Sequence, residues 1–144
     1  MRGRRWPDVE RVWRDLTGRG SGPPDPVASG ELDGLPEAAQ RYFRAAIRPG
    51  ARPFRTAEIG MTGTLDLGSR AQPRPWRMAG RQVLAPPHGF VWRVAARRGP
   101  LRVSGSDGLL DGLSWSRFRL FGVLPVAQDG GDPDHARSAL GRLV

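Results

Sequence analysis

Two imidazole side chains, His88 and His135, are the first candidates for acid–base or nucleophilic catalysis in this sequence. A catalytic triad needs a nucleophile, a base and an orienting acid, and neither histidine lies in a motif that supplies the other two. His88 lies in a Pro-Pro-His-Gly turn, and His135 lies in a polar loop. Both are interpreted as surface histidines, and no catalytic residue is assigned.

Metal and cofactor chemistry is also not indicated. The chain has no cysteine, which excludes disulfides, thiolate metal sites and cysteine nucleophiles. Asp132 and Asp134 flank His135, but this grouping lacks the ligand spacing of a metal site. Residues 107–112, Asp-Gly-Leu-Leu-Asp-Gly, lack the ligand positions of a calcium loop and are typical of two successive tight turns. The glycine-rich segment 18–22 lacks the Lys-Ser or Lys-Thr of a phosphate-binding loop, so no cofactor is predicted.

Aromatic side chains on alternating strand positions are the main candidate binding feature. They either fill the core between a sheet and its helices or line a pocket for an apolar ligand such as a lipid chain. Such pockets are mostly apolar with a few polar anchors, and arginines would then hold an anionic head group. The candidate apolar pocket comprises Trp76, Phe90, Trp92, Trp115 and Phe118, and the candidate head-group contacts are Arg81, Arg93 and Arg117.

The formal net charge of +9 suggests a nucleic-acid or membrane-surface partner. Every basic residue is arginine and none is lysine, while alanine, glycine and proline are abundant, as a genome rich in G and C would encode without any partner. The arginines are also dispersed, for example over 41–55 and 93–102, rather than gathered in one tract. The composition therefore argues against nucleic acid, which stays an alternative together with a protein-interaction role.

Length and hydropathy predict one domain in the cytoplasm. The 144 residues suit a single domain, and the longest apolar runs, such as 120–126, are far shorter than the roughly 20 residues that span a bilayer. The basic start, residues 1–7, lacks the apolar stretch of a signal peptide. We therefore expect no transmembrane segment and a cytoplasmic location.

Two helices are expected before the strands. The apolar residues of 7–16 recur at helical spacing, and the Gly/Pro-rich segment 20–26 predicts a linker, so this first helix is expected to be loosely attached. A second helix is expected to begin at 35–37, with proline at the first helical position. The expected organisation is a helix and linker over 1–34, and a helix with a sheet over 35–144. The predicted apolar face of the second helix comprises Ala38, Ala39, Tyr42, Phe43, Ala46 and Ile47.

Beyond Pro53 the apolar residues alternate with polar ones, which predicts strands. The connections are too short for parallel crossovers, so we expect an antiparallel meander whose last strand is an exposed edge. At the end of the sequence, Asp132-Pro133 starts an amphipathic helix with no cap and nothing to cover, which we interpret as a cut in a longer fold. The expected strands are 54–67, 76–84, 90–94, 101–103 and 115–123.

Three segments resemble an uncharacterised bacterial family, a domain of unknown function. Residues 35–43 match its Leu-Pro-x-x-x-x-Arg-Tyr helix, and 86–92 match its Pro-Pro-Gly-Phe-Val-Trp segment, with His88 as either an insertion or a substitution within a longer turn. Asp111-Gly112 followed by 117–126 matches further along. The resemblance implies a curved antiparallel half-barrel similar to periplasmic lipoprotein carriers, which can hold an acyl chain, and it implies that further strands follow the last helix.

The predicted fold class is therefore α+β, a curved antiparallel β-meander forming an incomplete half-barrel, with N-terminal helices and a cut-off C-terminal helix. The leading functional hypothesis is non-enzymatic binding of a hydrophobic or lipid-like ligand by the curved sheet. Two alternatives remain open. One is the interaction or nucleic-acid module that uses the arginines, and the other is an enzyme whose active site lies in the missing part of the fold.

Overall fold

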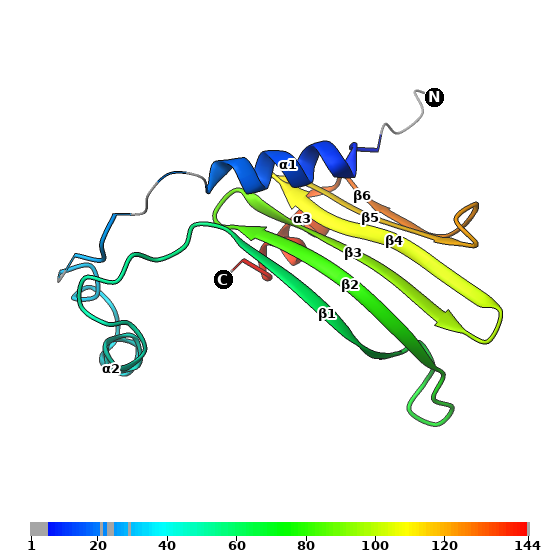
Figure 1. Ribbon diagram of the computed structural model, residues 1–144, viewed down its shortest axis with the longest axis horizontal. Helices are drawn as coiled ribbons and strands as arrows, with labels where there is room; N and C mark the ends of the chain where they lie inside the picture. The colour runs from blue at the N-terminus through cyan, green and yellow to red at the C-terminus, as the bar shows by residue number, and fades with distance from the viewer. Residues whose placement is uncertain (1–5, 21, 23–24, 29, 144) are drawn as a thin grey trace.

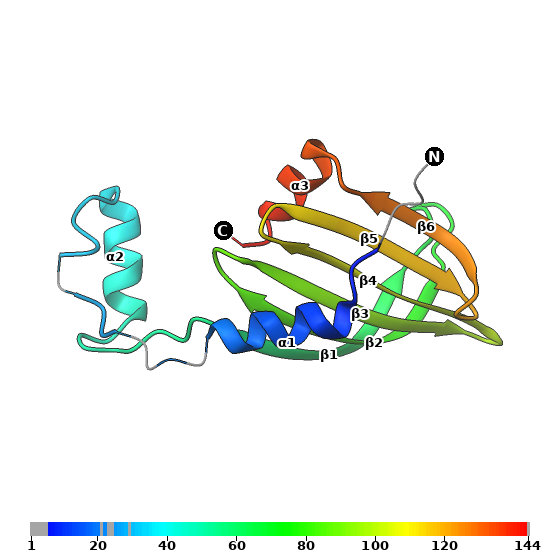
Figure 2. The same ribbon diagram turned by 90° about the horizontal axis from the view of Figure 1, so that it is seen from above.

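A curved six-stranded antiparallel sheet with three helices forms the structure, a computed structural model that describes residues 6–20, 22, 25–28 and 30–143. The strands follow one another in chain order from β1 to β6, and the sheet is not closed, as Figures 1 and 2 show. The predicted α+β class with a curved antiparallel sheet is thus confirmed. The elements are α1 (Val9–Arg19), α2 (Glu37–Ala46), β1 (Ala57–Asp66), β2 (Pro75–Ala85), β3 (Gly89–Arg98), β4 (Leu101–Leu110), β5 (Leu113–Leu120), β6 (Leu124–Gly130) and α3 (Pro133–Leu140).

Helices α1 and α3 cover opposite faces of the sheet (Figures 1 and 2). Successive side chains of a strand point to opposite faces, so Phe90 and Val91 belong to different cores. Val91 packs with Val83 under α1, and we call this side of the sheet the α1 face. Phe90 packs with Leu109 under α3, on what we call the α3 face.

Helix α1 belongs to the core, and the expectation that it is loosely attached was wrong. Leu16 is fully buried and Val12 is 6% exposed, both against the α1 face. At the end of the helix, Arg19 donates two hydrogen bonds of 2.8 and 2.7 Å to the carboxylate of Asp111 in the β4–β5 turn. The contacts of α1 cross the predicted boundary at residue 34, which itself stays a prediction. Residues 21, 23 and 24 of the predicted linker lie outside the described residues.

Helix α2 forms where it was expected, but its apolar face does not pack. None of its residues is buried, and Tyr42 is 68% exposed. Figures 1 and 2 show the helix standing away from the sheet. An amphipathic pattern predicts a helix with one apolar side, but it does not name the surface that covers that side.

Strand β4 is much longer than the three residues expected. Asp107-Gly108 lies inside this strand, so the prediction of a tight turn there was wrong, whereas Asp111-Gly112 forms a turn with positive φ at both residues. Gly108 is required because the indole of Trp115 lies over it: a Cβ at residue 108 would lie 2.3 Å from Trp115 Cζ2. The glycine that looked like a turn signal makes room for a neighbouring ring.

A sixth strand, β6, was not expected, and it covers the edge that the sequence left on β5. Pro125 argued against a strand here, because proline has no backbone N–H to donate to a neighbouring strand. Edge strands, however, tolerate proline. The register of β5 and β6 shifts between Phe118 and Arg119, and Arg119 lies opposite Pro125. The outer strands of the sheet are therefore β1 and β6.

Helix α3 begins at its expected residues and packs on the sheet. The side chain of Asp132 accepts a hydrogen bond of 2.8 Å from the backbone N–H of His135, which caps the first turn. Ala139 is 7% exposed, and Ala136 and Leu143 pack with it against Phe90 and its neighbours. The expectation that this helix has nothing to cover was wrong, because one end of the α3 face lies beneath it.

Candidate functional site

The predicted site residues divide between the two faces of the sheet. Trp76, Phe90, Trp92 and Phe118 lie on the α3 face, which follows from their positions in the register. Trp115 lies on the α1 face, 3% exposed beside α1, because it is an odd number of residues from Phe118 in the same strand. The three candidate head-group arginines, Arg81, Arg93 and Arg117, share the α1 face with Trp115. The structure therefore does not bring these arginines to the four aromatic side chains.

Apolar side chains continue along the α3 face beyond the part that α3 covers. Helix α3 packs over Phe90. From there toward the β1–β2 loop, the α3 face consists of successive rows, each made of residues that lie opposite one another on adjacent strands. Among the described residues, no helix covers these rows. Trp76 marks the far end of these rows, six residues along β2 from Gln82, the partner of Trp92. At about 3.3 Å per residue, these rows extend for about 20 Å. Their apolar members are Met61, Leu65, Trp76, Met78, Trp92, Val94, Ala96, Val103, Phe118 and Leu120.

Trp92 is the centre of this apolar surface. Its ring lies 6.2 Å from that of Phe118, centroid to centroid, although the two belong to strands separated by β4. Gly105 permits this contact, because a Cβ there would lie 2.6 Å from Phe118 Cδ1. On the other side, the indole N–H of Trp92 points to the sulfur of Met61 at 3.3 Å. Both Trp92 and Phe118 are half-buried, so each keeps part of its surface open.

The row of Trp92 is polar on the other strands from β2 to β6, where its members are Gln82, Asp107, Ser116 and Asp129. Of these, Asp107 forms an ion pair with Arg142. The guanidinium of Arg142 lies 2.7 Å from the carboxylate of Asp107 and stacks over Phe90 at 5.1 Å and Trp92 at 6.0 Å. The Asp107 side chain is 13% exposed, whereas that of Arg142 is 47% exposed. Arg142 therefore keeps donors free for an anion beside Trp92.

Sequence reasoning missed both members of this pair. Asp107 was assigned to a turn, and Arg142 carried no pattern of its own. The signal available was the alternation of β4: once 101–110 is taken as one strand, Asp107 falls on the same face as Leu109.

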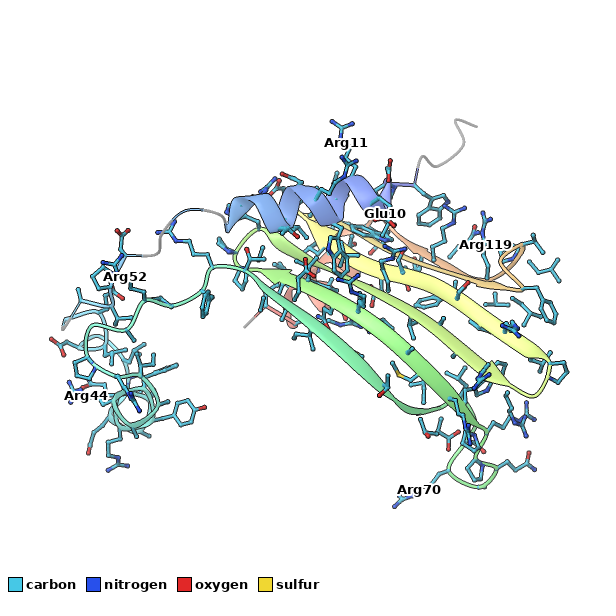
Figure 3. All side chains as sticks on the ribbon, in the orientation of Figure 1. Glu10, Arg11, Arg44, Arg52, Arg70 and Arg119 are labelled. Carbon is cyan, nitrogen blue, oxygen red and sulfur yellow. The ribbon has the colours of Figure 1, made fainter. Side chains whose placement is uncertain are left out.

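The three predicted head-group arginines do come together on the α1 face. Arg81, Arg93 and Arg117 lie in one row across β2, β3 and β5, with Ser106 between the last two. They line a cavity of about 790 Å³ beside the first turns of α1, where Figure 3 labels Glu10. Glu10 pairs with Arg93 at 2.6 Å, and Arg81 pairs with Glu58 at 3.0 Å. Two of the three charges are thus already neutralised by carboxylates.

The histidines have structural partners. His135 Nδ1 lies 2.7 Å from the hydroxyl of Ser114, and this contact joins the start of α3 to β5. Ser114 is only 6% exposed, which makes its hydroxyl poorly accessible to a substrate. His88 Nδ1 lies 3.8 Å from Asp111, whose pKa is held below its usual range chiefly by the hydrogen bonds from Arg19. Within the described ranges, no group of three or more His, Asp or Glu side chains could hold a metal ion. None of the described helices is long and apolar enough to cross a membrane.

One comparison with known proteins gives a match. The sequence model of a family described as a family of unknown function, DUF6544, matches residues 25–144, which include α2, the whole sheet and α3. A comparison with curated proteins and one with solved structures gave no match.

Proposed function

We propose, on the premise that this chain belongs to the DUF6544 family, that it binds a lipid-like molecule on the α3 face without catalysing a reaction. The observation that carries the proposal is the apolar surface around Trp92 and Phe118, which α3 leaves uncovered. None of its ten apolar members is fully exposed, and Trp76, Val94 and Ala96 are buried, while Trp92 and Phe118 are half-buried. A concave, mostly apolar surface of this kind is typical of small-molecule binding sites. A role for the sheet in holding an acyl chain was the leading hypothesis from the sequence.

The dimensions of the surface suit an extended acyl chain. The rows from Trp92 to Trp76 run for about 20 Å along the strands. The row of Trp92 itself is polar on the other strands from β2 to β6, whereas the two rows after it, which contain Phe118 and Leu120, are apolar on every strand from β2 to β6. Gly80 and Gly105 lie in one of these rows, and the Met61 and Phe118 side chains lean over them rather than standing upright. A flexible chain can therefore lie along the strands between side chains that are soft or aromatic.

The proposed head-group contact is Arg142, which replaces the three arginines expected from the sequence. Its guanidinium stands at the end of the apolar rows, over Trp92, and is already held by Asp107. An anion at this position would accept from the remaining N–H groups of Arg142 while its chain covers Trp92 and Phe118. This arrangement favours a single-chain anionic amphiphile such as a fatty acid.

Calorimetric titration of the chain with palmitate and decanoate tests the proposal. Palmitate is expected to bind more tightly, because each further buried CH₂ contributes up to about 0.8 kcal/mol. Phe118→Glu is expected to abolish binding by placing a charge in the middle of the apolar rows. The matched control is Leu113→Glu, since Leu113 is 71% exposed at the opposite end of β5.

The outcomes separate clearly. Loss of binding in Phe118→Glu, with binding retained in Leu113→Glu and both variants folded by circular dichroism, supports the site. Arg142→Gln is expected to weaken binding of palmitate but not of the uncharged alcohol of the same length. Equal affinity for palmitate and decanoate, or no binding of either, would contradict the proposal. A cytoplasmic location also stays a proposal, which cell fractionation tests.

A further inference from the structure

Arginines that form no ion pair with any described residue gather at one end of the sheet. A carboxylate, Asp66, lies at the same end, and its pKa is lowered chiefly by hydrogen bonds from two backbone N–H groups of the β1–β2 loop and also by the nearby charge of Arg98. This end, which we call the hairpin end, comprises the turns 67–74, 99–100 and 121–123 with the adjoining residues of the strands. None of its seven arginines forms an ion pair in the described part of the chain, whereas those near the opposite end, such as Arg19, Arg81 and Arg93, are paired. Figure 3 shows Arg70 projecting from the β1–β2 loop. The seven are Arg70, Arg74, Arg77, Arg97, Arg98, Arg102 and Arg119.

Three of these arginines oppose one another directly in the register. Arg77 pairs with Arg97 across β2 and β3, and Arg97 pairs with Arg102 across β3 and β4. Like charges directly opposite one another destabilise a sheet. The same three line a cavity of about 660 Å³ with Phe121, and no carboxylate lines it. An anionic partner would relieve a repulsion that no described residue lining this cavity compensates.

Exposed apolar side chains lie at the same end. Phe121 is 51% exposed and Val123 is 69% exposed, both in the β5–β6 turn. Leu67 in the β1–β2 loop is 50% exposed, and Leu124 at the start of β6 is 56% exposed. A single-stranded nucleic acid could stack a base on Phe121, but it offers nothing to the aliphatic side chains. The boundary between lipid head groups and acyl chains accommodates both kinds of side chain.

We propose that the hairpin end docks on an anionic lipid bilayer, with the arginines against the head groups and Phe121, Val123 and Leu124 inserted between them. The surface potential of anionic lipids attracts basic groups, and shallow insertion of apolar side chains adds to the attraction. This docking surface extends the proposed function, because the apolar rows of the α3 face end at Trp76, which lies beside the hairpin end. A docked sheet would thus present its ligand surface to the bilayer.

Vesicle co-sedimentation tests the docking surface. The chain is expected to bind phosphatidylcholine vesicles that contain about one-third phosphatidylglycerol, to bind pure phosphatidylcholine weakly, and to dissociate as salt rises. Each arginine near the surface contributes roughly a fivefold factor, so the triple variant Arg77→Gln/Arg97→Gln/Arg102→Gln is expected to partition about 100-fold less. Because it removes like-charge contacts, this variant is expected to fold.

Matched controls make the result specific. The triple variant Arg41→Gln/Arg44→Gln/Arg48→Gln removes the same charge from α2 and its C-terminal flank, away from the hairpin end, and is expected to bind vesicles as the native chain does. Val123→Ser is expected to weaken binding severalfold, whereas Leu113→Ser, at a residue of similar exposure in the opposite end, is not.

Three results would overturn the inference. The first is an equal loss of vesicle binding in the two triple variants, and the second is unchanged vesicle binding by Val123→Ser. The third is that single-stranded DNA displaces the native chain from vesicles and that Val123→Ser binds this DNA as tightly as the native chain does. Phe118→Glu separates this inference from the proposed function, since it is expected to lose palmitate and to keep vesicle binding. Failure of the docking surface would leave palmitate binding intact, and the reverse failure would leave vesicle binding intact.

Discussion

Replacing Leu16 by alanine tests whether α1 is part of the fold. Leu16 is fully buried on the α1 face and packs in one cluster with Val83 and Val91. Leucine-to-alanine substitutions at such sites cost about 2–5 kcal/mol, because the lost transfer energy is joined by the energy of the cavity. We take about 3 kcal/mol as the expected loss. For a chain of 144 residues, the entropy of unfolding is about 0.3 kcal/mol per degree, which converts this loss to about 10 °C in Tm.

Thermal unfolding followed by circular dichroism measures the shift, with Tyr42→Ala as the control. Tyr42 is 68% exposed on α2, a helix with no buried residue, so its truncation is expected to change the free energy of unfolding by less than about 0.5 kcal/mol. A Tm within about 2 °C of the native value for Leu16→Ala would refute the packing of α1. A large loss in Tyr42→Ala would refute the isolation of α2.

Two further substitutions probe the sheet and its turn. Gly108→Ala is expected to destabilise the fold by several kcal/mol, because the new Cβ would collide with Trp115. The control is Gly60→Ala, which is expected to be nearly neutral because nothing lies within 4 Å of a Cβ at that position. Urea unfolding compares the stability of the two variants. The pKa of Asp111 is lowered by its hydrogen bonds from Arg19, so the stabilisation is present above the ordinary carboxyl pKa of about 4 and is lost as pH falls through the lowered value. Asp111→Asn should therefore reduce stability at neutral pH, and the difference from the native chain should disappear in acid; a difference that persists in acid would contradict the charge-based explanation.

The sequence predicted the elements better than their surroundings. Alternation and helical spacing located α1, α2, α3 and four strands to within a few residues, because those patterns reflect local geometry. The partners of the helices depend on surfaces formed by distant strands. The linker composition of 20–26 therefore suggested a detached α1, although α1 supplies Leu16 to the core, and the apolar face of α2 suggested packing that does not occur.

Strand β4 shows why local turn signals mislead. Asp-Gly is a strong turn dipeptide, and it appears twice within six residues. Only the second pair turns the chain. In the first pair, Gly108 lies within the strand under the ring of Trp115, and Asp107 forms an ion pair with Arg142. Both requirements come from side chains that neighbour them in space and not in sequence.

The candidate site was predicted in its chemistry but not in its grouping. Trp92 and Phe118 do meet on one face, and the three arginines do form one row, but the two groups lie on opposite faces. Two residues of one strand share a face only if they are an even number of residues apart. Trp115 and Phe118 are three residues apart, so they could not have lined the same pocket. Arg142 could not be foreseen, because its place depends on how α3 docks.

The most direct test of ligand binding on the α3 face is a proton–nitrogen NMR titration that follows the five tryptophan indole N–H signals with palmitate. Single Trp→Phe variants assign the signals. We expect the signals of Trp92 and Trp76 to shift together with a common affinity, while those of Trp115 and Trp13, which lie on the α1 face and its helix, stay in place. Shifts confined to Trp115 and Trp13, or no shift at all, would contradict ligand binding on the α3 face.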